Sequence, residues 1–67
     1  MIPEFLSIEA FGGTRLRAKD ACHKQAKEYF GSMSGIDIVR IDASAQEKDF
    51  SGAVSLWKVE IQYRMVS

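Results

Sequence analysis

The sequence predicts an α+β domain with the order strand, helix, strand, strand, in which a three-stranded antiparallel sheet packs on one helix. Three observations support this. Within residues 54–66, positions 57–65 alternate between apolar and polar side chains, as expected of a strand with one buried face. Residues 15–30 contain no glycine or proline and repeat small apolar residues at helical spacing. Residues 36–43 are rich in β-branched residues, which favour strands.

The first strand is expected over residues 2–11. Its apolar side chains on one face are Ile2, Leu6, Ile8 and Ala10. Phe5 and Phe11 fall on the other face. A single helix covers only one face of a sheet, so these two phenylalanines favour a second burial surface. The alternative is that twist or an edge loop hides them.

The helix is expected over residues 15–30. Thr14 suits its N-cap, after a strand end at Gly12 and Gly13, and Gly31 suits the position that follows its last turn. The face predicted to lie on the sheet consists of Ala18, Ala21, Cys22, Gln25, Ala26 and Tyr29, with Phe30 at its margin. These mostly small side chains allow a close approach to the sheet but bring little apolar area.

The second strand is expected over residues 36–43, with apolar side chains on both faces. Ile36 and Ile38 fall on one face, and Val39, Ile41 and Ala43 fall on the other. Residues 44–52 are mostly polar and predict a hairpin loop longer than the two-residue type. Phe50 is the apolar exception there. We expect it to fold back onto the sheet, with contact to a partner as the alternative.

The last strand, from Val54 to Val66, has the clearest pattern. One face carries Trp57, Val59, Ile61, Tyr63 and Met65, and the other carries Lys58, Glu60, Gln62 and Arg64. At about 3.3 Å per residue the strand extends roughly 40 Å, about twice the commonest length, which favours a strand that outgrows its own subunit. Strands joined through a helix run parallel and hairpin strands run antiparallel. The predicted strand order is therefore 1-3-2, with the helix on the Trp57, Ile61 and Met65 face.

Size and composition favour a homo-oligomer. A chain of 67 residues buries only about 60% of its surface on folding, so small domains often need a disulfide, a metal or association. Cys22 and His23 are the only cysteine and histidine, which leaves no intrachain disulfide and no set of Cys or His metal ligands. Nine basic and nine acidic residues give zero net charge, which disfavours nucleic acid as a partner. No apolar run approaches about 18 residues, so no membrane partner and a cytoplasmic location are expected.

Patterns for catalysis are weak, and neither an enzyme nor a catalytic residue is predicted. Cys22 and His23 are adjacent, but neighbours on a helix point about 100° apart, so they do not form a nucleophile and base pair. Cys22 is interpreted as a small core residue and His23 as a solvated one. Trp57 is the best candidate for stacking on a planar ligand, with a core or interface role as the alternative.

Three stretches of the chain resemble one family of small proteins. They are Glu9-Ala10-Phe11-Gly12-Gly13-Thr14, the helix with Ala18, Ala21, Cys22 and Ala26, and Gly52 followed by Val54 and Trp57-Lys58-Val59-Glu60-Ile61. In these residues and in the order of its elements, the chain resembles the dodecins. The resemblance implies a hollow assembly of twelve subunits that binds and sequesters flavins without catalysing a reaction.

The chain departs from the dodecins at the flavin contacts. Members that bind flavin stack it on a tryptophan early in the second strand, where this chain has residues 36–38, Ile-Asp-Ile. Their glutamine near the start of the last strand is matched by Lys58. The cofactor is therefore unassigned, with flavin as one possibility and Trp57 and Lys58 as the candidate binding residues. We expect a non-enzymatic, dodecin-like homo-oligomer that binds or stores a small molecule. The alternative is a small protein–protein interaction module that uses a strand edge or the Phe5 and Phe11 surface.

Overall fold

The computed structural model describes residues 5–66 and shows one helix and one sheet. The elements are β1 (Phe5–Gly12), α1 (Arg15–Phe30), β2 (Ile36–Lys48) and β3 (Val54–Met65). The strands lie in the order β1-β3-β2, and β3 pairs antiparallel with both neighbours. The predicted fold class and strand order are therefore confirmed. The expected place of Ile2 lies outside the described residues.

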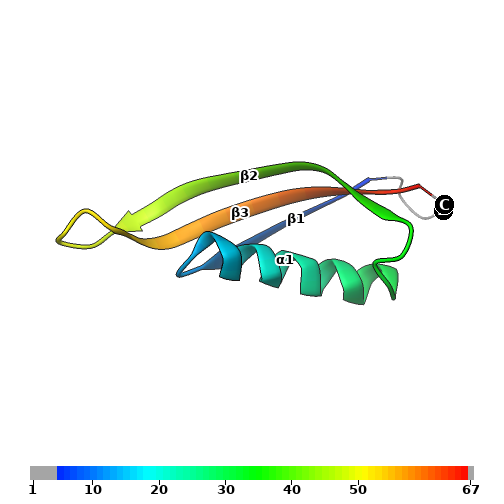
Figure 1. Ribbon diagram of the computed structural model, residues 1–67, viewed down its shortest axis with the longest axis horizontal. Coiled ribbons are helices and arrows are strands. Elements are labelled where there is room, and N and C mark those ends of the chain that lie inside the picture. The colour runs from blue at the N-terminus through cyan, green and yellow to red at the C-terminus, as the bar shows by residue number, and fades with distance from the viewer. Residues whose placement is uncertain (1–4, 67) are drawn as a thin grey trace.

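α1 packs on β1 and β3 (Figure 1). β2 lies beside β3, at the edge of the sheet opposite to β1. The fully or nearly fully buried core comprises Ile8, Ala10, Ala18, Cys22, Ala26, Val59, Ile61 and Tyr63. The helix is capped as predicted: the Thr14 hydroxyl accepts the Arg17 amide at 3.0 Å, and Gly31, at φ 81°, donates its amide to the Lys27 carbonyl. Both caps satisfy backbone groups that the helix leaves free at its ends.

The helix face differs from the predicted one at its far end. Tyr29 is 51% exposed and Gln25 is exposed, whereas Phe30 packs against the core. The buried residues of α1 follow a row of every fourth residue, and Phe30 is the next member of that row after Ala26. The Tyr29 ring instead lies edge-on to Phe30, with ring centroids 5.1 Å apart.

β2 contains a bulge that changes which of its residues share a face. The pairing with β3 shifts between Ile38 and Arg40, so Val39 is an extra residue in the ladder. Ile38 then lies opposite Tyr63 and Ile41 lies opposite Ile61, and both residues of β2 thus join the face on which α1 lies. The prediction that Ile38 and Ile41 occupy opposite faces was wrong, because the inserted residue Val39 shifts the alternation of side chains by one position.

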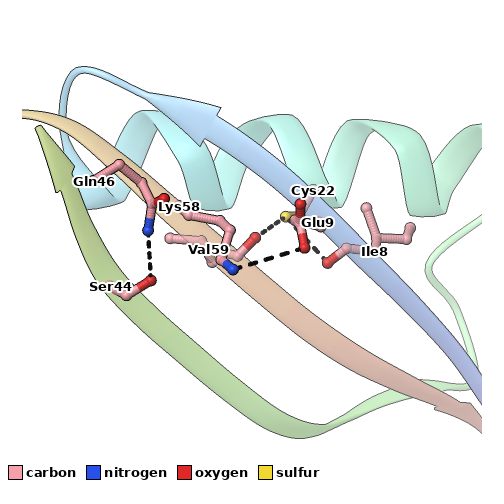
Figure 2. Close-up of polar contacts among 7 residues, drawn as sticks. All are labelled: Ile8, Glu9, Cys22, Ser44, Gln46, Lys58 and Val59. Carbon is pink, nitrogen blue, oxygen red and sulfur yellow. Dashed lines mark hydrogen bonds and ion pairs between the residues drawn. The ribbon is translucent and has the colours of Figure 1, made fainter.

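The second strand is longer, and the loop shorter, than predicted. Residues 44–48 continue β2, and their side chains include Gln46, whose amide donates to the Ser44 hydroxyl at 3.0 Å (Figure 2). The remaining turn is closed by Asp49, whose amide donates to the Ala53 carbonyl at 2.8 Å. The prediction of a loop over residues 44–48 was wrong. These residues form a strand that is exposed to solvent, and polar side chains are compatible with such a strand.

Phe50 does not fold back onto the sheet. It is 112% exposed relative to an extended reference, so that expectation was wrong. The reason lies in the turn, where one carboxylate oxygen of Asp49 accepts from the Ser51 amide at 2.9 Å, the Ser51 hydroxyl at 2.6 Å and the Ala53 amide at 3.1 Å. These bonds, the Ser51 hydroxyl foremost, lower the pKa of Asp49. The turn is thus closed by its own polar groups and leaves the phenylalanine outside.

The molecule is elongated, measuring 47 × 16 × 16 Å. Its radius of gyration is 13.5 Å, against about 11 Å for a compact domain of this length. β1 pairs with β3 only as far as Trp57, and beyond it β2 and β3 continue as a two-stranded arm past the start of α1 (Figure 1). The described residues contain no helix that is long and apolar enough to cross a membrane.

Candidate functional site

The two predicted binding residues, Trp57 and Lys58, point to opposite faces of the sheet. Trp57 lies opposite Gly12 and Ala45, on the face that carries α1. Lys58 lies opposite Phe11 and Ser44 on the outer face. Adjacent residues of a strand alternate in this way, so the structure does not bring the two side chains into one site.

Trp57 is half-buried and already has a cationic neighbour. The guanidinium carbon of Arg15 lies 5.0 Å from the centroid of the indole ring, within the range of a cation–π contact. Arg15 begins α1, so the helix start and β3 together position this pair. A planar ligand that stacks on the ring face occupied by Arg15 would have to displace this guanidinium. Ligand stacking on Trp57 stays a prediction.

Lys58 belongs to a polar and solvated surface. Its Nζ lies 4.0 Å from a carboxylate oxygen of Glu9 (Figure 2), and on the same face Arg40 pairs with Asp42 at 2.8 Å. A shallow hollow of about 140 Å³ lies over this face, lined by Ser7, Arg40, Asp42, Glu60 and Gln62. Exposed ion pairs contribute at most about 1 kcal/mol. A binding role for Lys58 likewise stays a prediction.

A larger groove lies on the helix side, between the first half of α1 and β2. Its volume is about 350 Å³, and it is lined by Arg15, Leu16, Lys19, Ile41, Ala43 and Val59. Leu16 is 66% exposed and Ile41 is 44% exposed, whereas Val59 is buried. Two cationic side chains accompany them. We call this feature the apolar groove.

Sequence reasoning missed the apolar groove for two reasons. Alternation placed Ile41 and Ala43 on one face of the second strand but did not show that this face, opposite Ile61 and Val59, is the one that carries α1. Leu16 lies outside the small-residue face of the helix, so the pattern that predicted the contact between helix and sheet did not include it. The available signal was the double apolar character of residues 36–43, which indicated that one helix would not cover the whole sheet.

Cys22 and His23 of α1 and Tyr63 of β3 form a small cluster between the helix and the sheet. The Cys22 thiol lies 3.4 Å from the Val59 carbonyl oxygen and 3.7 Å from that of Ile8 (Figure 2). Burial raises the pKa of the thiol, which disfavours the thiolate needed for nucleophilic attack.

His23 was expected to be solvated, and that prediction was wrong. It is half-buried, and its Nδ1 lies 2.7 Å from the Tyr63 hydroxyl, within hydrogen-bonding distance. Tyr63 is fully buried, and loss of solvation, followed by the nearby Cys22, raises its pKa to about 12. The only imidazole of the chain is therefore engaged with the core.

No protein-family model, curated protein or solved structure matches the chain. The resemblance to dodecins therefore rests on the residues quoted for it and stays a prediction. Within residues 5–66, no three side chains of His, Cys, Asp or Glu are grouped so that they could hold a metal ion.

Proposed function

We propose that the protein is a non-enzymatic homo-oligomer of the dodecin kind that binds or stores a small molecule. The observation that carries the proposal is the apolar strip that α1 leaves uncovered, where Leu16, Ile38 and Ile41 are 66%, 43% and 44% exposed. Among residues 5–66 the core comprises only eight buried side chains. Contiguous exposed apolar surface of this kind marks an interaction site, and a small domain gains stability by covering it.

The apolar groove is the best place for a small ligand. Its volume of about 350 Å³ falls at the lower end of the usual range for ligand pockets. The floor is apolar and the cations come from Arg15 and Lys19, which suits a ligand with an apolar body and an anionic group. Arg15 also connects the groove to Trp57 through its contact with the indole. A flavin nucleotide is one molecule with this chemistry.

The chemistry of the core supports a non-enzymatic role. The only thiol, that of Cys22, is fully buried and its pKa is raised by burial. The only imidazole, that of His23, lies within hydrogen-bonding distance of the Tyr63 hydroxyl. We expect Cys22 of the folded protein to react slowly with a thiol reagent at neutral pH and rapidly after unfolding. Fast reaction of the folded protein would count against this part of the proposal.

A second candidate function is favoured by the outer face of the sheet. Phe5 and Phe11 are 44% and 51% exposed there, beside Arg64 and Lys58. An interaction module would use such residues, or an unpaired strand edge, to bind another protein. It would be a monomer or dimer without a retained small molecule.

Native mass spectrometry of freshly purified protein separates the two candidates. A closed oligomer with added non-covalent mass is the expected result. Denaturing spectra of the same sample provide the control, because the added mass should then separate from the chain. A bare monomer or dimer would contradict the storage function and favour the interaction module.

A further inference from the structure

Among the described residues, the apolar side chain with the greatest exposure lies at the end of the two-stranded arm. Phe50 is 112% exposed, and the turn that carries it is held by three hydrogen bonds to one Asp49 oxygen. The arm consists of β2 and β3 beyond Trp57, where β1 no longer pairs (Figure 1). An aromatic side chain presented on a fixed support suits the role of an anchor that fills a pocket on a partner.

The apolar groove lies on the same molecule but out of reach of its own Phe50. The groove contains Ile41, and the ladder continues from there to Lys48 before the turn begins. Seven residues of extended strand span about 23 Å. Phe50 can therefore enter this groove only on another copy of the chain.

The charges of the two surfaces are complementary. Arg15 and Lys19 contribute positive charge to the groove. The end of the arm, residues 47–53, carries Glu47 and Asp49 against Lys48, which is a net charge of −1. The Asp49 carboxylate is ionised at neutral pH, as an exposed aspartate is, and the hydrogen bonds of the turn lower its pKa further. Complementary charge of this kind favours correct docking and disfavours other orientations.

We propose that Phe50 of one copy inserts into the apolar groove of a second copy, between Leu16 and Ile41. This inference rests on the proposed self-association and names the contact that produces it. Arm and groove are different surfaces, so the contact is either reciprocal in a two-fold dimer or repeated from subunit to subunit around a closed ring. In both cases the partner covers Leu16 and Ile41, and a small ligand would occupy the remaining part of the groove, at Arg15 beside Trp57.

The first test replaces the anchor. Phe50→Ala should weaken self-association by at least about 30-fold in the dissociation constant, the range of an interface hot spot. The control is Phe11→Ala, which removes a half-exposed phenylalanine from the outer face and should leave association unchanged. Analytical ultracentrifugation measures the constants. Circular dichroism should show the same fold for both variants, since neither ring is buried.

The second test mixes two variants that each lack one half of the contact. Phe50→Ala keeps the groove, and Ile41→Glu keeps the arm but puts a charge into the groove. Each alone should be impaired, whereas an equimolar mixture should form a one-to-one complex by native mass spectrometry. Leu16→Ala serves as a second groove variant if Ile41→Glu does not fold. Failure of the mixture to associate, with both partners folded, would overturn the inference.

The third test exchanges charges across the contact. Lys19→Glu and Glu47→Lys should each weaken association, and the double variant should restore much of it, because every copy then carries the reversed pair. An effect of the double variant equal to the sum of the single effects would contradict the proposed docking.

These experiments separate failure of the inference from failure of the proposed function. A wild-type protein that stays monomeric would overturn both. A wild-type oligomer that is unaffected by Phe50→Ala would overturn the inference alone. Loss of association in Phe11→Ala instead would place the interface on the outer face. Protection of the β2 backbone amides from hydrogen exchange, with no effect of Phe50→Ala, would indicate that two copies pair through this strand edge. Either result contradicts the insertion of Phe50.

Discussion

Ile61 and Ile41 are the same residue type, lie directly opposite one another in the sheet and share one face. Ile61 is fully buried and Ile41 is 44% exposed. The difference arises from α1, which packs on β1 and β3 and leaves β2 uncovered. A helix is about 10 Å across and strands lie about 4.8 Å apart, so one helix covers about two strands. The helix-covered half therefore maintains the fold, and the β2 half is available for contacts.

The largest expected effect tests this contrast directly. Ile61→Ala should destabilise the monomer by about 2–5 kcal/mol, because it removes buried methylene groups and leaves a cavity. Ile41→Ala should cost less than about 1 kcal/mol, because its side chain is already open to solvent. Urea unfolding at low protein concentration measures both. Equal costs would show that β2 is covered within the monomer.

Close packing of the helix gives the next largest effect. A Cβ on Gly12 would lie 2.7 Å from the Ala18 backbone nitrogen, whereas one on Gly13 would meet nothing nearer than 4.0 Å. Gly12→Ala should therefore cost about 1–3 kcal/mol through overpacking. Gly13→Ala is the matched control and should change stability by less than about 0.5 kcal/mol. A harmless Gly12→Ala would mean that α1 sits farther from the sheet.

The helix start should show a smaller effect. Thr14→Ala removes the hydroxyl that accepts the Arg17 amide and should cost about 1 kcal/mol. Thr14→Ser keeps the acceptor and should retain most of the stability. Thermal unfolding of the two variants gives the comparison, and equal losses would argue that the hydroxyl does not cap α1.

The last effect is absent at neutral pH and develops only in alkaline solution. The pKa of Tyr63 is raised to about 12 in the folded protein, from 10 for a free side chain. A raised folded pKa means that the stabilisation is complete below pH 10 and is lost as the pH rises toward 12. Wild type should therefore lose more stability over this range than Tyr63→Phe, which has no phenol to ionise. Parallel losses would indicate that Tyr63 is solvated.

Sequence reasoning located the elements and the strand order because each depends on local residues. Thr14 and Gly31 bound the helix through their own backbone geometry, and alternation from Trp57 to Met65 identified the buried face of β3. The position of His23 was not predictable in the same way. Its contact with Tyr63 joins residues 40 apart in the chain, and no local pattern reports such a pair.

The apolar groove was beyond sequence reasoning for a different physical reason. It depends on the register between β2 and β3, which places Ile41 opposite Ile61 and Ala43 opposite Val59 and which the composition of β2 does not report. Phe50 was assigned to the sheet by the general rule that large apolar residues are buried, and its turn closes through Asp49 instead. Leu16, Ile41 and Phe50 are apolar but exposed, and they are the residues that the proposed assembly would bury.

The most direct measurement of the central claim is the urea midpoint of the wild-type protein at several protein concentrations. Association through the uncovered half stabilises the folded state by mass action, so the midpoint should rise over about two decades of concentration and should rise less for Phe50→Ala. A midpoint that does not change with concentration would show that the β2 half stays uncovered in solution, and it would contradict the account.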